Sequence, residues 1–234
     1  NGDEATIYVD AETGLIVGGP DNGLAYSGTL NGTNSGNEVI VGTSGNDTIN
    51  AQGGTNTICS LKGDDVITSG SGNDWIEAGN GNDDVNADGG DNIVTSLSGN
   101  NHIITGSGRD TITTGPGDDV VEAGNGDNTI QAGDGANNIT GGSDDDAITT
   151  GAGDDIINAE TGAGNGKNTV QAGEGNNKVT TGTGNDDITA GSGNDIIDAG
   201  NGGNTVNAGN GNNTVTTGTG NDDITAGSGN DIID

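Results

Sequence analysis

The apolar residues of this chain recur at intervals of nine. From residue 33 onward the sequence divides into 22 units, and position 8 of every unit is Ile or Val, as in Ile76, Val121 and Ile188. One obligatory aliphatic residue between two variable ones predicts a very short strand with a single inward side chain. A strand of this kind in every unit predicts an all-β chain built from repeats.

Glycine marks a second fixed position. Position 4 is glycine from Gly36 to Gly229, with Asp144 as the one exception, and four additional residues at 160–163 delay the count once. The Gly-x-Gly-Asn-Asp run permits positive φ and predicts a turn before each strand. Two units, or 18 residues, therefore close one coil of a flattened solenoid. About eleven coils at one strand spacing of about 4.8 Å would form a rod on the order of 50 Å long.

Residues 1–32 lie outside the repeat. The stretches ATIYVD and GLIVGG predict two short strands around an AETG turn, so we expect 1–32 to form an N-terminal β cap and 33–234 to form the solenoid. No comparable cap follows the last unit. An unprotected sheet edge is a template for pairing, which predicts a longer array or end-to-end self-association.

The composition excludes a conventional core. The chain has 50 Gly, no Phe and no Met, and 36 acids face four bases, for a net charge of −32. Such a composition is typical of disorder unless a cation neutralises the acids, so we expect the metal-free chain to be unfolded. The charge also excludes nucleic acid as a partner, and no apolar run is long enough to span a membrane.

Position 6 supplies the candidate metal ligands. It is Asp in twelve units, Asn in nine and Glu in one. A carboxylate beside turn carbonyls offers the hard oxygens that calcium accepts in flexible geometry, whereas magnesium demands a stricter octahedron. One His and one Cys cannot build transition-metal sites. The predicted calcium ligands are Asp47, Asp65, Asp74, Asp83, Asp110, Asp119, Asp146, Asp155, Asp186, Asp195, Asp222 and Asp231.

Asp and Asn alternate in pairs at position 6. Since one coil holds two units, an Asp coil follows an Asn coil, and the full period is 36 residues. Three interpretations stay open: calcium at every level, calcium at alternate levels, or an Asn ladder that only forms hydrogen bonds. They concern Asn92, Asn101, Asn128, Asn137, Asn168, Asn177, Asn204 and Asn213.

The units resemble the calcium-binding nonapeptide repeat of RTX proteins, G-G-x-G-x-D-x-U-x with U aliphatic. The stretch AGSGNDIID (190–198) matches it at Gly191, Gly193, Asp195 and Ile197, although the first glycine is mostly Ala, Thr or Ser in this chain. The resemblance implies a right-handed parallel β-roll with calcium ions in the turns on both edges. It also implies folding outside the cell, where calcium is millimolar.

These features predict a calcium-dependent structural or adhesive β-roll of a secreted or cell-surface protein, fibre or layer. No Ser/His/Asp set or isolated carboxylate pair stands out, so we expect no enzyme activity. One alternative is an ice-binding domain, because the TGTGND turns resemble those of RTX-type ice-binding adhesins. The other is a passive secretion and folding module of a larger RTX toxin or hydrolase.

Overall fold

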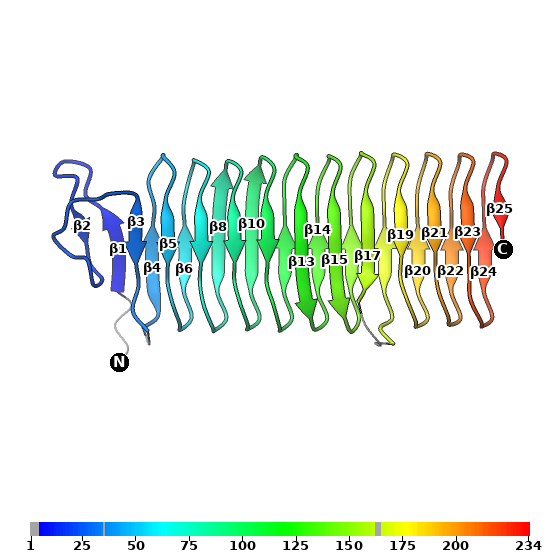
Figure 1. Ribbon diagram of the computed structural model, residues 1–234, viewed down its shortest axis with the longest axis horizontal. Helices are drawn as coiled ribbons and strands as arrows, with labels where there is room; N and C mark the ends of the chain where they lie inside the picture. The colour runs from blue at the N-terminus through cyan, green and yellow to red at the C-terminus, as the bar shows by residue number, and fades with distance from the viewer. Residues whose placement is uncertain (1–4, 35, 162–164) are drawn as a thin grey trace.

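The strands stack side by side into an elongated rod, with β1 and β2 at one end and β25 at the other (Figure 1). The computed structural model describes residues 5–34, 36–161 and 165–234. Within these ranges the chain forms strands and turns without a helix, and so without a helix that could cross a membrane. The predicted parallel β-solenoid of about eleven coils is confirmed.

Two parallel sheets form the faces of the rod. Sheet 1 contains β2 (Ile16–Val17), β1 (Ala5–Val9), β4 (Glu38–Val41), β6 (Thr57–Cys59), β8 (Trp75–Asn80), β10 (Ile93–Ser98), β12 (Thr111–Thr113), β14 (Thr129–Gln131), β16 (Ala147–Thr149), β18 (Thr169–Gln171), β20 (Asp187–Thr189), β22 (Thr205–Asn207) and β24 (Asp223–Thr225). Sheet 2 contains β3 (Thr29–Asn31), β5 (Thr48–Asn50), β7 (Val66–Thr68), β9 (Asp84–Asn86), β11 (His102–Ile104), β13 (Val120–Asn125), β15 (Asn138–Ser143), β17 (Ile156–Glu160), β19 (Lys178–Thr180), β21 (Ile196–Asp198), β23 (Thr214–Thr216) and β25 (Ile232–Ile233).

The register of the sheets carries the sequence period into space. Ile112 of β12 lies opposite Ile130 of β14, 18 residues later, and the same offset joins Val121 of β13 to Ile139 of β15. Every residue of the repeat therefore stacks on its equivalent in the next coil. The insertion near 160 lengthens this offset, so that Ile148 lies opposite Val170, and a register shift between β8 and β10 places Ser96 opposite Gly79.

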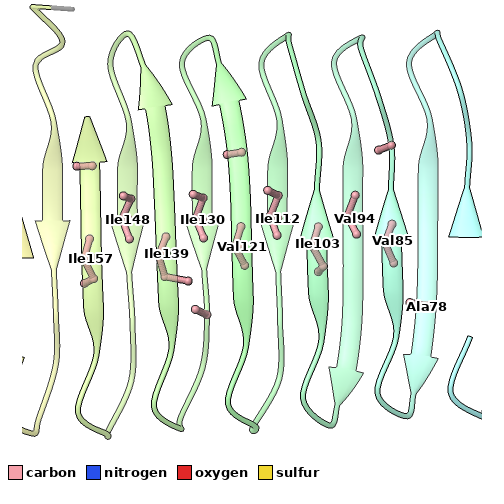
Figure 2. Packing of buried hydrophobic residues seen from close by; sticks show 14 of the residues in the cluster. Ala78, Val85, Val94, Ile103, Ile112, Val121, Ile130, Ile139, Ile148 and Ile157 are labelled. Atoms are coloured by element: carbon pink, nitrogen blue, oxygen red, sulfur yellow. The ribbon is translucent and has the colours of Figure 1, made fainter. Parts of the chain in front are cut away.

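The core is a double column of position-8 side chains. Ile112 and Ile139 come from opposite sheets, and both are fully buried between them (Figure 2). Neighbouring positions face outward: Ile156 is 51% exposed, whereas the next residue, Ile157, is 1% exposed. The expected single inward side chain per strand is thus present. Small residues at position 1, such as Ala123, fill the remaining space at the ends of the coil.

The N-terminal segment continues both columns. The two strands expected in it are β1 and β2, which pair antiparallel, and β1 also pairs in parallel with β4. Ile7 lies opposite Ile40, and Leu30 of β3 lies opposite Ile49. The boundary at residue 32 between a cap and the solenoid stays a prediction, because the core columns already begin within residues 5–31.

Close stacking of the coils explains why glycine recurs at a regular spacing in the turns. Gly117 has φ 151°, and a Cβ there would overlap the carbonyl oxygen of Gly99 in the preceding coil. Gly45 holds the same repeat position, but a Cβ there would meet only the Thr43 hydroxyl at 3.8 Å. The glycine requirement at position 4 therefore comes from the coil below the turn as much as from the turn itself.

We expect Ile157→Ala to destabilise the calcium-loaded rod by about 2–5 kcal/mol, because it removes a buried side chain from a column that cannot close the cavity. Ile156→Ala makes the same chemical change one residue away, on the solvent face, and should stay within about 0.5 kcal/mol. Urea unfolding followed by circular dichroism measures both. Equal losses of stability in the two variants would contradict the assignment of the inward face.

We expect Gly117→Ala to cost more than about 1 kcal/mol, because the new methyl group collides with a backbone oxygen and not with a movable side chain. Gly45→Ala is the matched control, and its effect should be several-fold smaller. Thermal unfolding in calcium compares the two. A Gly117→Ala variant with the melting temperature of the parent chain would show that the coils are less tightly stacked than the structure has them.

Candidate metal-binding turns

The charged side chains at position 6 are buried in the turns. Ten of the twelve predicted ligands are no more than 2% exposed, while Asp222 and Asp231 are partly exposed. They occupy two edges of the rod. Edge 1 comprises the turns that lead into sheet 1 and carries Asp74, Asp110, Asp146, Asp186 and Asp222; edge 2 comprises the turns that lead into sheet 2 and carries Asp47, Asp65, Asp83, Asp119, Asp155, Asp195 and Asp231.

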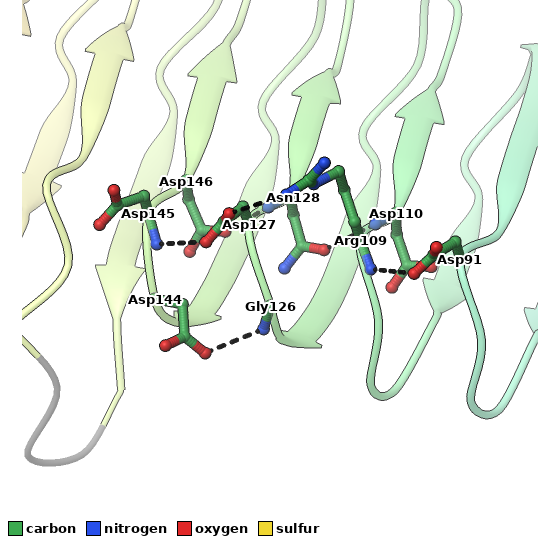
Figure 3. Close-up of polar contacts among 9 residues, drawn as sticks. All are labelled: Asp91, Arg109, Asp110, Gly126, Asp127, Asn128, Asp144, Asp145 and Asp146. Carbon is green, nitrogen blue, oxygen red and sulfur yellow. Dashed lines mark hydrogen bonds and ion pairs between the residues drawn. The ribbon is translucent and has the colours of Figure 1, made fainter.

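One oxygen of each position-6 side chain has a structural role. The backbone N–H of Asp110 donates to Oδ1 of Asn128 in the next coil at 3.0 Å, and the N–H of Asn128 donates to Oδ1 of Asp146 at 3.0 Å (Figure 3). The same bond, 2.7–3.1 Å long, continues along both edges. We call this chain of bonds the inner ladder. Asp and Asn serve it equally well, because both offer a carbonyl-type oxygen.

A second ladder lies on the outside of the turns and is built from position 5. The backbone N–H of Arg109 donates to Oδ1 of Asp91 at 2.8 Å, and the N–H of Asp145 donates to Oδ1 of Asp127 at 3.3 Å (Figure 3). These bonds point back to the preceding coil, opposite to the inner ladder. Arg109 also pairs with Asp127 at 3.2 Å, but both side chains are exposed, so the pair contributes little stability.

In the Asn turns the second side-chain atom is hydrogen-bonded. Nδ2 of Asn137 donates to the carbonyl oxygens of Gly135 at 3.1 Å and Gly133 at 3.3 Å. Nδ2 of Asn177 donates to the carbonyl of Gly175 in its own turn and to that of Ala190 in the next coil. Each position-6 Asn donates to at least one backbone carbonyl in this way.

In most of the Asp turns the second atom is a carboxylate oxygen without a hydrogen-bond donor. Within the described residues, Oδ2 is buried and has no hydrogen-bond partner in eight of them: Asp65, Asp74, Asp110, Asp119, Asp146, Asp155, Asp186 and Asp195. The atom keeps the place that Nδ2 takes in Asn turns. A Cβ on Gly141, at position 1 of the same unit, would overlap Oδ2 of Asp146, and Oδ2 of Asp83 lies 3.5 Å from the hydroxyl of Ser96, at position 1 of the next coil.

Burial raises the pKa of these carboxyl groups above their ordinary range. Loss of solvation raises the pKa of Asp146 to about 7; for Asp83, loss of solvation together with the neighbouring Asp65 carboxylate raises the pKa to about 6. Burial also raises the pKa of Asp110 and Asp119, against the opposing effect of the N–H groups of the inner ladder. A buried, ionised carboxylate needs a counter-charge.

Basic side chains do not supply that charge in the described part of the chain. The ion pairs there join Arg109 to Asp127 and His102 to Asp84, both at the surface and neither at position 6. Clusters of three or more acidic, His or Cys side chains that could hold a metal are also absent from the described residues. Each Asp turn thus offers one carboxylate, and backbone carbonyls would have to supply most other oxygens.

Position 1 is a contributor to the turns that the sequence pattern did not identify. Its side chain is buried in most units, and in five of them a hydroxyl donates to the position-1 carbonyl of the next coil: those of Ser60, Ser69, Thr105, Thr150 and Thr181. The hydroxyl of Thr114 is buried beside the carboxylate of Asp119, where it opposes the rise in the pKa of Asp119 that burial causes. Its signal lay in the sequence: seven of twelve Asp units have Ser or Thr at position 1, and eight of nine Asn units have Ala.

The donor set fits calcium. An unpartnered carboxylate oxygen, nearby carbonyl oxygens and, in several turns, a buried hydroxyl are all hard ligands. Carbonyl-rich sites of irregular geometry suit calcium, which takes six to eight oxygens, better than magnesium. Glu38 begins edge 1 with the same feature, because its Oε2 is also buried and unpartnered within the described residues.

Comparison with known protein families matches the chain to the RTX calcium-binding nonapeptide repeat. Seven matches together extend over residues 32–233: 32–67, 61–94, 95–130, 122–157, 131–164, 162–197 and 198–233. A search of curated proteins found no significant match. The nine-residue period, the parallel coils and the buried position-6 carboxylates agree with the matched repeat, and the chain belongs to the RTX calcium-binding nonapeptide-repeat family.

Proposed function

We propose that this chain is a calcium-dependent β-roll that serves as a structural or adhesive element outside the cell. The observation that carries the proposal is the set of eight buried Asp side chains whose second carboxylate oxygen has no partner among the described residues. A calcium ion in each such turn would neutralise the carboxylate and accept the lone pairs of the neighbouring carbonyls. Family membership supports calcium as the ion.

The ligands in this proposal are the twelve position-6 carboxylates on both edges. Each would bind through Oδ2, since Oδ1 accepts an inner-ladder N–H in eleven of them and the Thr43 hydroxyl in Asp47. The residues are Asp47, Asp65, Asp74, Asp83, Asp110, Asp119, Asp146, Asp155, Asp186, Asp195, Asp222 and Asp231. In Asp47, Oδ2 also accepts the backbone N–H of Thr43 at 2.6 Å, so this turn is the weakest member of the fully buried set.

Calcium would act as a folding switch. A chain with a net charge of −32 that buries unpaired carboxylates is held open by desolvation and repulsion until cations bind. Extracellular calcium modules bind their ions with dissociation constants of about 10⁻⁴–10⁻³ M. Such a chain would stay unfolded at low cytosolic calcium and fold after export, which supports the extracellular assignment.

The surface supports a mechanical role and not a catalytic one. Outward positions are mostly Thr, Asn, Asp and Gln, and we propose no enzyme activity for them. The strands at the ends of the two sheets have backbone groups without a neighbouring strand, so further repeats or a second copy could extend the rod by the same parallel pairing. Ice binding gains no support, because Trp75, Gln131 and Asp187 interrupt the outward Thr rows of sheet 1.

Calcium titration tests the proposal directly. Starting in excess chelator, the far-ultraviolet circular dichroism of the full chain should change from a disordered to a β spectrum as free calcium rises to the millimolar range. Magnesium at the same concentration should produce a much smaller change, because it tolerates the irregular oxygen set poorly. A complete β spectrum in chelator would refute a calcium-dependent fold.

Acid should partly replace calcium in the chelated chain. The ten buried position-6 Asp carboxyls have folded-state pKa values above the ordinary 3.8, reaching about 6 for Asp83 and about 7 for Asp146. The stabilisation from protonating them is therefore fully present below about pH 3.8 and is lost as the pH rises through 6 to 7. Circular dichroism from pH 3 to 8 in chelator should lose β signal over this window. A chelated chain with the same spectrum at pH 3 and pH 8 would contradict the prediction.

A further inference from the structure

The Asn turns contain a donor at the point where the Asp turns lack one. In both kinds of turn Oδ1 accepts the backbone N–H of the preceding coil, as in Asn137 and Asp119. The second side-chain atom therefore faces equivalent surroundings in both. In Asn137 that atom donates two hydrogen bonds to carbonyl oxygens of the turn, whereas in Asp119 it is a buried acceptor with no partner among the described residues.

The hydrogen bonds of the Asn amide use the same lone pairs that a cation would need. Nδ2 of Asn177 donates to Gly175 and Ala190, and Nδ2 of Asn168 donates to Gly166 and Thr181. These carbonyls belong to the turn and to the next coil, so the amide bridges two coils. A calcium ion at this point would have to displace the amide hydrogens and leave Nδ2 buried without an acceptor.

We propose that each position-6 Asn is a built-in replacement for a calcium ion, so that calcium occupies only the Asp turns and the Asn coils are metal-free spacers. The inference rests on the calcium-binding function proposed above and specifies where the ions lie. It assigns one ion to each Asp turn, hence eight ions for the turns with an unpartnered Oδ2 and at most twelve for all position-6 Asp residues.

Alternation also reduces repulsion between the ions. On edge 1, from Asp74 to Asp222, every Asp turn is followed by an Asn turn, so neighbouring ions would lie two strand spacings apart, about 9–10 Å. Coulomb energy falls inversely with distance, so this spacing halves the repulsion relative to adjacent coils. Edge 2 contains one exception, because three adjacent coils there carry Asp at position 6: Asp47, Asp65 and Asp83.

Three variants on edge 2 test the inference. Asp119→Asn should remove one bound ion and keep the fold, since the new amide supplies the missing donor. Asn137→Asp should add one ion. It creates the run Asp119, residue 137, Asp155, equivalent to the natural run at Asp47, Asp65 and Asp83. Asp118→Asn makes the same chemical change at an exposed position 5, where Oδ1 accepts the N–H of Ala136, and should leave the count unchanged.

Native mass spectrometry of the full chain in saturating calcium measures the number of ions directly, and circular dichroism of the same samples verifies the fold. For the parent chain we expect eight to twelve ions, with one fewer in Asp119→Asn and one more in Asn137→Asp. About 20 ions in the parent chain would overturn the inference while leaving calcium binding intact. No bound calcium at all would refute the proposed function together with it.

A second readout does not depend on the ion count. In the calcium-loaded chain, the side-chain amide protons of the position-6 Asn residues should exchange with solvent at least 100-fold more slowly than those of exposed residues such as Asn100 or Asn194. Nuclear magnetic resonance of the side-chain NH₂ groups measures this exchange. Fast exchange at Asn137 would show that its amide does not hold the carbonyls of the turn and would overturn the inference even if Asp119→Asn fails to fold.

Discussion

The structure depends on one buried hydrogen bond per turn, from the backbone N–H at position 6 to a side-chain oxygen of the next coil. A solenoid coil must reverse direction twice, and at each reversal the chain leaves the two sheets and their regular backbone pairing. The N–H of Asp110 would be buried without a partner if Asn128 did not supply its Oδ1. Leaving such a donor unpaired costs about 1–3 kcal/mol, and the cost would recur at every coil.

This requirement places a side chain with two polar atoms inside each turn, although the backbone N–H needs only one of them. Oδ1 satisfies the backbone, and the second atom is left among carbonyl oxygens. An amide satisfies them by itself, whereas a carboxylate adds one more acceptor and a charge. Whether position 6 is Asn or Asp therefore leaves the backbone conformation of the turn unchanged, and the difference lies in the need of the carboxylate for a cation. The fold and the calcium dependence proposed for it rest on different atoms of the same residue.

The period of nine was sufficient to predict the coils, the inward aliphatic column and the two edges, because stacking repeats every local feature at a fixed offset. The same argument could not identify what surrounds Nδ2 of Asn137 or Oδ2 of Asp119, since those surroundings come from two coils at once. The burial of position 1 could not be predicted either, because Ala, Ser and Thr occur on protein surfaces as well as in cores. The cap boundary at residue 32 was placed where the glycine period begins, although Leu30 already stacks on Ile49.

The alternating pattern is best understood as a compromise between two costs of stacking identical coils. A column of Asn alone would need no ion, but it would also fold without calcium and offer no control by export. A column of Asp alone would place carboxylates and divalent ions about 4.8 Å apart along both edges, where each ion repels its neighbours most strongly. The run Asp47, Asp65 and Asp83 places carboxylates in consecutive coils, and Asp65 contributes there to the raised pKa of Asp83. Alternation keeps a carboxylate in every second coil, which retains the proposed need for calcium in folding, while each amide coil between them separates the charges and maintains the ladder.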